Sequence, residues 1–255
     1  MMTRLSLHLA LAILTTPFLL AQDADWSSRL NWEEGRLELT ASIAIDREGA
    51  NAPAAAYRAE QEIAAALTTE LVEALIPFRL NSRSTLGDRL RGEPDLYARI
   101  AGLERRTERR VTRPDRTLSE LTVGYVLELF PHLSSLLVKE SRPLPIGKVL
   151  GWVPSQEYTG IVIYAAEPLP IHGTDLTGRI VPALYPEIFD ENMMEVLTED
   201  QVDREWVRRW GTAAYTESLD LSMHSERIGN NPKRIVPREL FGISQTDLVI
   251  SDDDA

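Results

Sequence analysis

The chain has 255 residues, with 27 Lys and Arg against 39 Asp and Glu, which gives a net charge of −12 without any cysteine. Apolar residues make up 44% of the sequence, which excludes intrinsic disorder, and the lack of cysteine excludes a disulfide framework. The acidic balance also argues against nucleic acid as a partner, because neutralised phosphates supply much of the affinity of nucleic-acid-binding proteins.

The N-terminus has the pattern of a secretory signal peptide. Arg4 is the only charged residue among the first 22, residues 5–20 are almost wholly apolar, and the small residue Ala21 precedes a polar stretch. The apolar run is short for a membrane span and Pro17 interrupts it, so an uncleaved anchor is the weaker interpretation. We therefore expect residues 1–21 to be removed, leaving a periplasmic or secreted protein with no integral membrane span. A lipoprotein anchor is excluded because it requires a cysteine.

Charge divides the remaining chain into two parts. Residues 22–145 carry 17 basic and 20 acidic side chains, whereas residues 146–255 carry 9 and 19. The segment 142–147, Arg-Pro-Leu-Pro-Ile-Gly, is typical of a connection between domains. We predict a first domain over 22–145 and an acidic C-terminal domain over 146–255.

The first domain begins with a strand and a long helix. Trp26 and Trp32 precede the alternating apolar and polar residues 37–45, which predict a half-buried strand. Asn51 is suited to cap an alanine-rich helix over 54–76, which contains neither Gly nor Pro. Its apolar residues recur every four positions and predict one stripe facing a sheet, formed by Ile63, Leu67, Leu71 and Leu75.

Short helices at 86–90 and 95–103 are expected next, followed by a hairpin of strands 104–111 and 117–130. This order predicts an α+β fold, with a long alanine-rich helix packed on a small antiparallel sheet.

The acidic part has shorter elements. A buried strand is expected at 160–165, a loop at 168–178, and a helix from Glu199 after the capping residue Thr198. Further short strands are predicted at 179–181, 187–189, 235–236 and 247–250. We expect a second, smaller domain that is α+β or mostly β.

Few residues support catalysis or metal binding. His132, His172 and His224 are each isolated in the sequence, and no thiolate is available, so we predict no metal site and no cofactor. The sequence has neither a Gly-x-Ser-x-Gly elbow nor a phosphate-binding glycine loop. No catalytic residue can be assigned, although a serine triad assembled from distant segments stays open.

One region is strongly basic. Residues 79–116 contain eleven arginines against six acids. A strand over 104–110 would place Arg106 and Arg110 on one face, and Arg105 and Arg109 on the other. These four arginines form either a salt-bridged solvent face or a binding patch for an acidic envelope protein or an anionic envelope polymer. The acidic second domain is a further candidate partner, within one chain or through self-association.

Two groups of segments resemble exported envelope proteins. Tyr57-Arg58-Ala59, residues 71–76, Leu80-Asn81-Ser82 and residues 85–88 resemble the family that includes a small outer-membrane lipoprotein and the N-terminal part of flagellar assembly protein T. Residues 160–165, 182–191, 227–232 and 246–251 resemble a companion region in related bacterial proteins of unknown function. The lipidation cysteine and an acidic residue expected near Tyr164 are missing, and the loop 167–179 is expanded.

The resemblance implies an α+β fold, an envelope location associated with the outer membrane, and an assembly role such as that around a flagellar basal body. The leading hypothesis is therefore a non-enzymatic envelope protein with a structural, assembly or macromolecule-binding role. The alternative is a periplasmic hydrolase whose site lies between the domains and recruits a serine, His172 or His224, and an aspartate. A small-molecule binder is a third possibility.

Overall fold

The computed structural model describes residues 24–45, 51–115, 117, 119–138 and 157–255. The predicted signal peptide at 1–21 and the predicted connection at 142–147 lie outside the described residues.

The first domain is built on a four-stranded antiparallel sheet. Its strands are β1 (Asp25–Asn31), β2 (Arg36–Ala44), β3 (Glu108–Pro114) and β4 (Glu120–Glu128), in the order β1-β2-β4-β3. Side chains alternate across the two central strands, so that one face is buried and contains Leu37, Leu39, Ala41 and Ile43 of β2 and Leu121, Val123, Tyr125 and Leu127 of β4.

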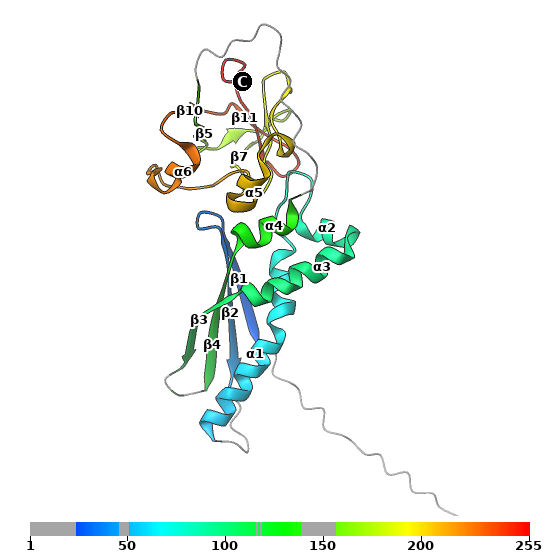
Figure 1. Ribbon diagram of the computed structural model, residues 1–255, viewed down its shortest axis with the longest axis vertical. Coiled ribbons are helices and arrows are strands. Elements are labelled where there is room, and N and C mark those ends of the chain that lie inside the picture. Colours follow the sequence, from blue (N-terminus) through cyan, green and yellow to red (C-terminus); the bar gives the residue numbers. More distant parts are fainter. Residues whose placement is uncertain (1–23, 46–50, 116, 118, 139–156) are drawn as a thin grey trace, which may run out of the picture.

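Helix α1 (Ala52–Leu75) covers the buried face of this sheet (Figure 1). Asn51 caps it, because the side-chain oxygen accepts a hydrogen bond of 3.0 Å from the N–H of Ala54. The predicted stripe of Ile63, Leu67, Leu71 and Leu75 is buried in the common core. The prediction of a long alanine-rich helix packed on an antiparallel sheet is confirmed.

Short helical segments complete the first domain. They are α2 (Leu86–Gly92), α3 (Pro94–Ala101), a 3-10 helix (Gly102–Arg106), a π-helical turn (Leu129–Leu133) and α4 (Ser134–Leu137). Thr85 and Asp88 form a reciprocal capping box at the start of α2. Among the described residues, no helix has both the length and the apolar character needed to cross a membrane.

The second domain is smaller and mixed. Strand β5 (Gly160–Ile163) runs parallel to β10 (Pro232–Ile235), and β6 (Leu169–Pro170) pairs with β7 (Thr177–Gly178). A second sheet has the order β11-β12-β8-β9, with strands Glu239–Phe241, Asp247–Val249, Ile188–Phe189 and Glu195–Leu197. The helices are α5 (Arg204–Trp210) and α6 (Ser225–Ile228), each preceded by a 3-10 turn, Glu199–Gln201 and Ser222–His224. The predicted second, smaller domain is confirmed.

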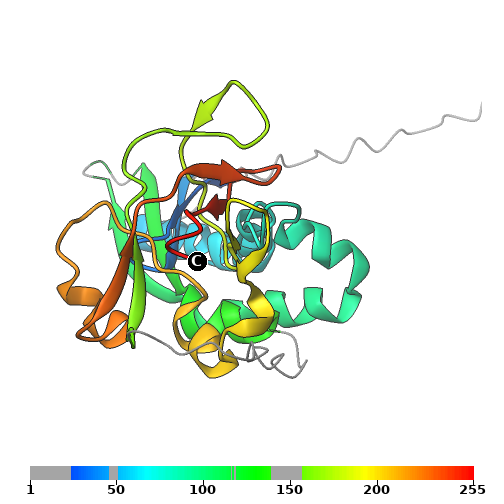
Figure 2. The same cartoon turned by 90° about the horizontal axis from the view of Figure 1, so that it is seen from above.

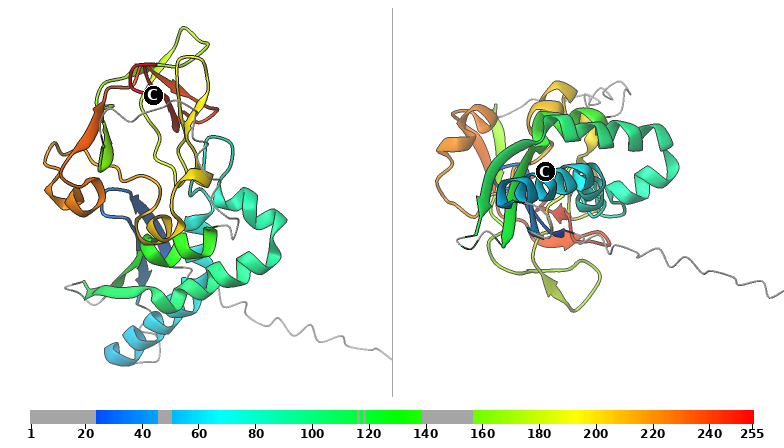
Figure 3. Two further views of the ribbon diagram at one scale, coloured as in Figure 1. Left: turned by 45° about the horizontal axis from the view of Figure 1, so that its top comes forward. Right: turned by 90° about the horizontal axis from the view of Figure 1, so that it is seen from below.

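The second domain lies on one end of the first (Figures 1 and 2). The two domains share buried side chains. Leu184, Tyr185 and Val207 belong to the core that α1 and the sheet form. The N–H of Leu184 donates to the carbonyl of Arg79 (3.1 Å), and the N–H of Tyr185 donates to that of Leu80 (2.8 Å). Figure 3 shows the same arrangement from two further directions.

Trp32, at the tip of the β1–β2 hairpin, also joins the two domains. Its ring stacks on Phe78 with a centroid distance of 4.9 Å and meets Tyr215 edge-on at 5.6 Å. The side chain of Thr216 donates to Glu33 at 2.6 Å. The hairpin tip is therefore held between residues of both domains.

Several element predictions are wrong. Trp26 lies inside β1, which the sequence does not signal because this edge strand has no clean alternation of buried and exposed residues. Residues 104–106 belong to the 3-10 helix, and β3 begins only at Glu108. The predicted helix from Glu199 is a 3-10 turn followed by α5, because Asp203 starts a new helix by capping Glu205.

Two further predictions in the second domain are corrected. Residues 179–181 form no strand, although Val181 donates its N–H to the carbonyl of Gln245. The predicted loop at 168–178 contains β6 and β7, because Leu169 pairs with Gly178 and Pro170 with Thr177.

Candidate functional site

The four predicted patch arginines lie next to one another in the chain but on two different elements. Arg105 and Arg106 end the 3-10 helix, whereas Arg109 and Arg110 lie in β3, the edge strand of the sheet. The predicted alternation of faces is wrong, because the 3-10 helix replaces the first half of the strand and a bulge interrupts the register between Arg109 and Val111.

Two of these arginines are paired with nearby acids. Arg109 forms an ion pair with Glu60 of α1, and its Nε donates to Thr112 at 2.8 Å. Arg110 forms an ion pair of 2.8 Å with Glu108. Both pairs are partly exposed, so each contributes little to stability. This half of the patch fits the interpretation as a salt-bridged solvent face.

The other arginines at this edge have no ion pair with a described residue. Arg105 and Arg106 are exposed and have no ion pair within the described part of the chain. The same is true of Arg113, which lies near the end of β3. We call these five residues the arginine edge: Arg105, Arg106, Arg109, Arg110 and Arg113. Arg113 was not in the predicted patch. It belongs to the arginine edge because it lies in the same edge strand, β3.

Other arginines of the basic region face the second domain. The Nη1 of Arg79 donates to the hydroxyl of Ser244 at 2.6 Å. Burial raises the pKa of Glu187, and the positive charge of Arg83 partly offsets this increase. The acidic domain therefore meets Arg79 and Arg83, while Arg109 and Arg110 pair with acids of their own domain.

A buried carboxylate lies beside this contact. Asp247 is 1% exposed, and its Oδ1 accepts hydrogen bonds from the N–H of Glu187 (3.2 Å) and the hydroxyl of Thr246 (2.7 Å). Burial raises the pKa of Glu187, and the charges of Asp247 and Glu195 raise it further. Among the residues that the structure describes, no group of three acidic or histidine side chains is arranged to hold a metal ion.

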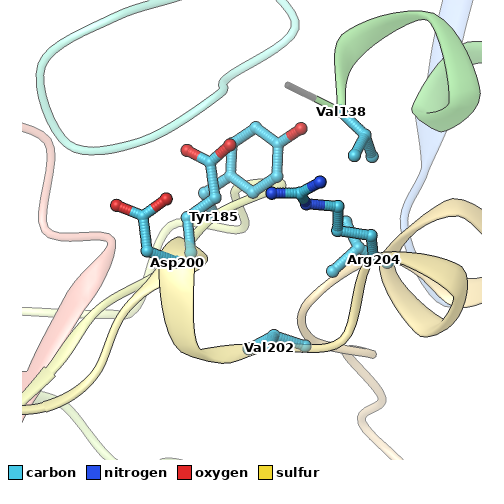
Figure 4. Close-up of a pocket in the computed structure, with 7 residues that line it drawn as sticks. Val138, Tyr185, Asp200, Val202 and Arg204 are labelled. Carbon is cyan, nitrogen blue, oxygen red and sulfur yellow. The ribbon is translucent and has the colours of Figure 1, made fainter. Parts of the chain in front are cut away.

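A small hollow lies at the junction of the two domains (Figure 4). Val138 lines it from the first domain, and Tyr185, Asp200, Val202 and Arg204 line it from the second. Its volume of about 10 Å³ is room for a single water molecule. The hydroxyl of Tyr185 is buried there and has no hydrogen-bond partner among the residues that the structure describes. The hollow lies between the domains, where the sequence predicts the alternative site, and its described lining includes neither a serine nor a histidine.

The histidines are not assembled into a catalytic site in the described ranges. His172 Nδ1 lies 2.6 Å from Glu239 Oε2, but both side chains are more than a third exposed. The ring meets Phe241 edge-on at 5.7 Å. Neither His132 nor His224 has a hydrogen-bonded serine or carboxylate in the same described ranges.

Two family models match the chain in succession. Residues 23–136 match the model described as Treponema pallidum Tp0624, N-terminal domain, and residues 160–255 match the model described as Treponema pallidum Tp0624, second domain. The two segments are thus similar to consecutive domains of one protein, and those descriptions state no activity. No curated protein matches the chain.

Proposed function

We propose that the protein is a non-enzymatic, exported cell-envelope protein with a structural, assembly or macromolecule-binding role. It acts in the periplasm or outside the cell, associated with the outer membrane. Its arginine edge binds an acidic envelope protein or an anionic envelope polymer. The observation that carries this proposal is the pair of exposed guanidinium groups of Arg105 and Arg106, which lack an ion pair in the described part of a chain with a net charge of −12.

Electrostatics favours a macromolecular partner at this edge. In an acidic protein, an arginine within reach of a carboxylate commonly pairs with it, as Arg109 and Arg110 do. Arg105 and Arg106 instead present their donors to solvent, and guanidinium groups bind carboxylate or phosphate oxygens bidentately. The local positive field also accelerates encounter with an anionic surface, and this acceleration weakens as salt increases.

The export part of the proposal rests on the N-terminal sequence pattern. Cleavage after Ala21 would remove the apolar segment and leave a chain that begins just before β1. N-terminal sequencing of the protein recovered from the periplasm or medium is expected to start at Gln22. Recovery of the intact segment on protein from the cytosol would contradict export.

Charge reversal tests the arginine edge. The double variant Arg105→Glu, Arg106→Glu should recover roughly tenfold less of the anionic partner from envelope extract at low salt, because attraction becomes repulsion. The loss should shrink at high salt. The control is Arg29→Glu, which reverses one charge at the opposite edge of the sheet, since Arg29 is exposed on β1 and has no ion pair among the described residues. Equal recovery by the double variant and the wild type would remove the arginine edge from the proposal.

The alternative of a periplasmic hydrolase depends on the hollow between the domains. Tyr185, Asp200 and Arg204 bring a hydroxyl, a carboxylate and a cation to it, but only a water molecule fits beside them. A purified sample that hydrolyses ester, peptide or glycoside substrates over many turnovers would replace the binding proposal with this one.

A further inference from the structure

The two edges of the first sheet differ in how well they are protected against pairing with another strand. β3 has a bulge after Arg109, several charged side chains, and Pro114 at its end, which all obstruct the addition of a strand. β1 pairs with β2 in an unbroken register from Asp25 to Asn31 and contains no proline. Its outer side therefore presents a regular row of backbone donors and acceptors.

A hollow lies beside this open strand. It has a volume of about 220 Å³ between β1 and α1, which run next to each other at this side of the molecule (Figure 1). Trp26, Ser28 and Leu39 line it from the sheet, and Glu70, Glu73 and Ala74 line it from α1. Alternate side chains of a strand point to the same face. A strand added to β1 would thus direct every second side chain into this hollow.

The wall formed by α1 is acidic and uncompensated. Glu70 and Glu73 are neighbours on the helix surface, and within the described ranges neither is paired with a cation. Arg29 of β1 is opposite Glu38 in the register, and Glu38 alternates with the buried Leu37 and Leu39. Arg29 therefore lies on the face of the sheet away from α1. A basic side chain in the hollow would supply the missing charge.

The hollow and the outer edge of β1 together form a groove. We propose that this groove binds an extended peptide segment of a partner protein, which pairs with β1 as an additional strand. Lysine or arginine side chains of the segment lie against Glu70 and Glu73, and apolar side chains between them lie against Trp26. Backbone hydrogen bonds supply the affinity, and the charged wall selects the sequence. The groove and the arginine edge lie at opposite edges of the sheet, so the two proposals stand or fall separately.

The probe is a synthetic peptide of seven residues, the length of β1, in which lysine and valine alternate on one face and threonine occupies the other. Binding of the labelled peptide to the purified protein is measured by fluorescence anisotropy. Backbone amide exchange is measured by mass spectrometry. We expect saturable binding, together with slower exchange in the peptides that cover β1, because the added strand bonds to its outer edge.

The variant Glu73→Lys should weaken this binding roughly fivefold. Glu62→Lys makes the same change of charge on the exposed side of α1 outside the hollow, and it should leave the affinity unchanged. A second peptide has glutamate in place of lysine. Its affinity for the wild type should be no higher than the affinity of the lysine peptide for Glu73→Lys.

Equal binding of the lysine and glutamate peptides, or binding without slower exchange in β1, would overturn the proposal. A different result would also overturn it: the lysine peptide fails to bind, and the protein forms a concentration-dependent dimer that Glu73→Lys abolishes. The occupant of the groove would then be a second copy of this chain.

Discussion

Tyr185 and Tyr215 both lie at the junction of the domains, and the surroundings of their hydroxyl groups differ. Tyr215 donates to the carbonyl of Ala183 (3.0 Å) and accepts from its N–H (3.1 Å). The hydroxyl of Tyr185 is buried and has no partner among the described residues. Burial raises the pKa of both phenols, so both are neutral at physiological pH.

This difference predicts opposite effects of removing one oxygen atom. Tyr185→Phe should raise the free energy of unfolding by about 1 kcal/mol, because it removes a buried polar group without a partner. Tyr215→Phe should lower it by about 1 kcal/mol, because the backbone groups of Ala183 lose their partner. Urea unfolding followed by circular dichroism measures both. A loss of stability in Tyr185→Phe would mean that its hydroxyl has a partner in solution.

At the scale of the element, α1 contributes more buried residues than any other described helix or strand. Its side chains at Ile63, Leu67, Leu71 and Leu75 face the sheet, and the alanines Ala55 and Ala59 are also buried. Small residues near the start of the helix and leucines near its end let the helix pack closely along the sheet. The helix thereby positions Glu60 for Arg109 and Glu70 and Glu73 for the groove.

Leu71→Ala tests the contribution of this helix. Leu71 is fully buried, so we expect a loss of about 2–5 kcal/mol in the free energy of unfolding from the lost contacts and the cavity. Tyr57→Ala, at a side chain of α1 that is 62% exposed, should change the stability much less. Both are measured by chemical denaturation. Similar losses in the two variants would mean that α1 does not hold the core in solution.

The whole molecule is joined across its domain boundary by shared burial and by the hairpin tip. Leu184, Tyr185 and Val207 of the second domain complete the core of the first, and the described part of the second domain also buries apolar side chains of its own, among them Phe189, Leu248 and Ile250. The shared core therefore couples the two domains.

We accordingly expect the two domains to unfold in one cooperative transition. Urea transitions followed by far-ultraviolet circular dichroism and by tryptophan fluorescence should coincide, because tryptophans occur in both domains. Trp32→Ala should lower the midpoint, since Trp32 contacts both Phe78 and Tyr215. Two separated transitions in the wild type would show that the shared core does not couple the domains.

The sequence by itself determined the elements whose signal is local. The helix after Asn51 has its cap, its four-residue apolar spacing, and neither Gly nor Pro after its first turn. The strands β2 and β4 have the two-residue alternation of a half-buried sheet. These patterns record burial on one side of a single element, so they can be read without knowing its neighbours. They were sufficient to predict the α+β class and the helix-on-sheet layers.

The tertiary structure alone decided the features that depend on distant residues. β1 was missed because this edge strand is mostly exposed: Trp26 and Leu30 pack partly against the core, which gives no clear alternation of buried and exposed residues. Arg109 pairs with Glu60, which is 49 positions away, because α1 crosses the sheet. The same arrangement leaves Arg105 without a partner among the described residues. The groove exists only because α1 lies beside β1. Charges and cavities arise from contacts through space, which spacing along the chain does not record.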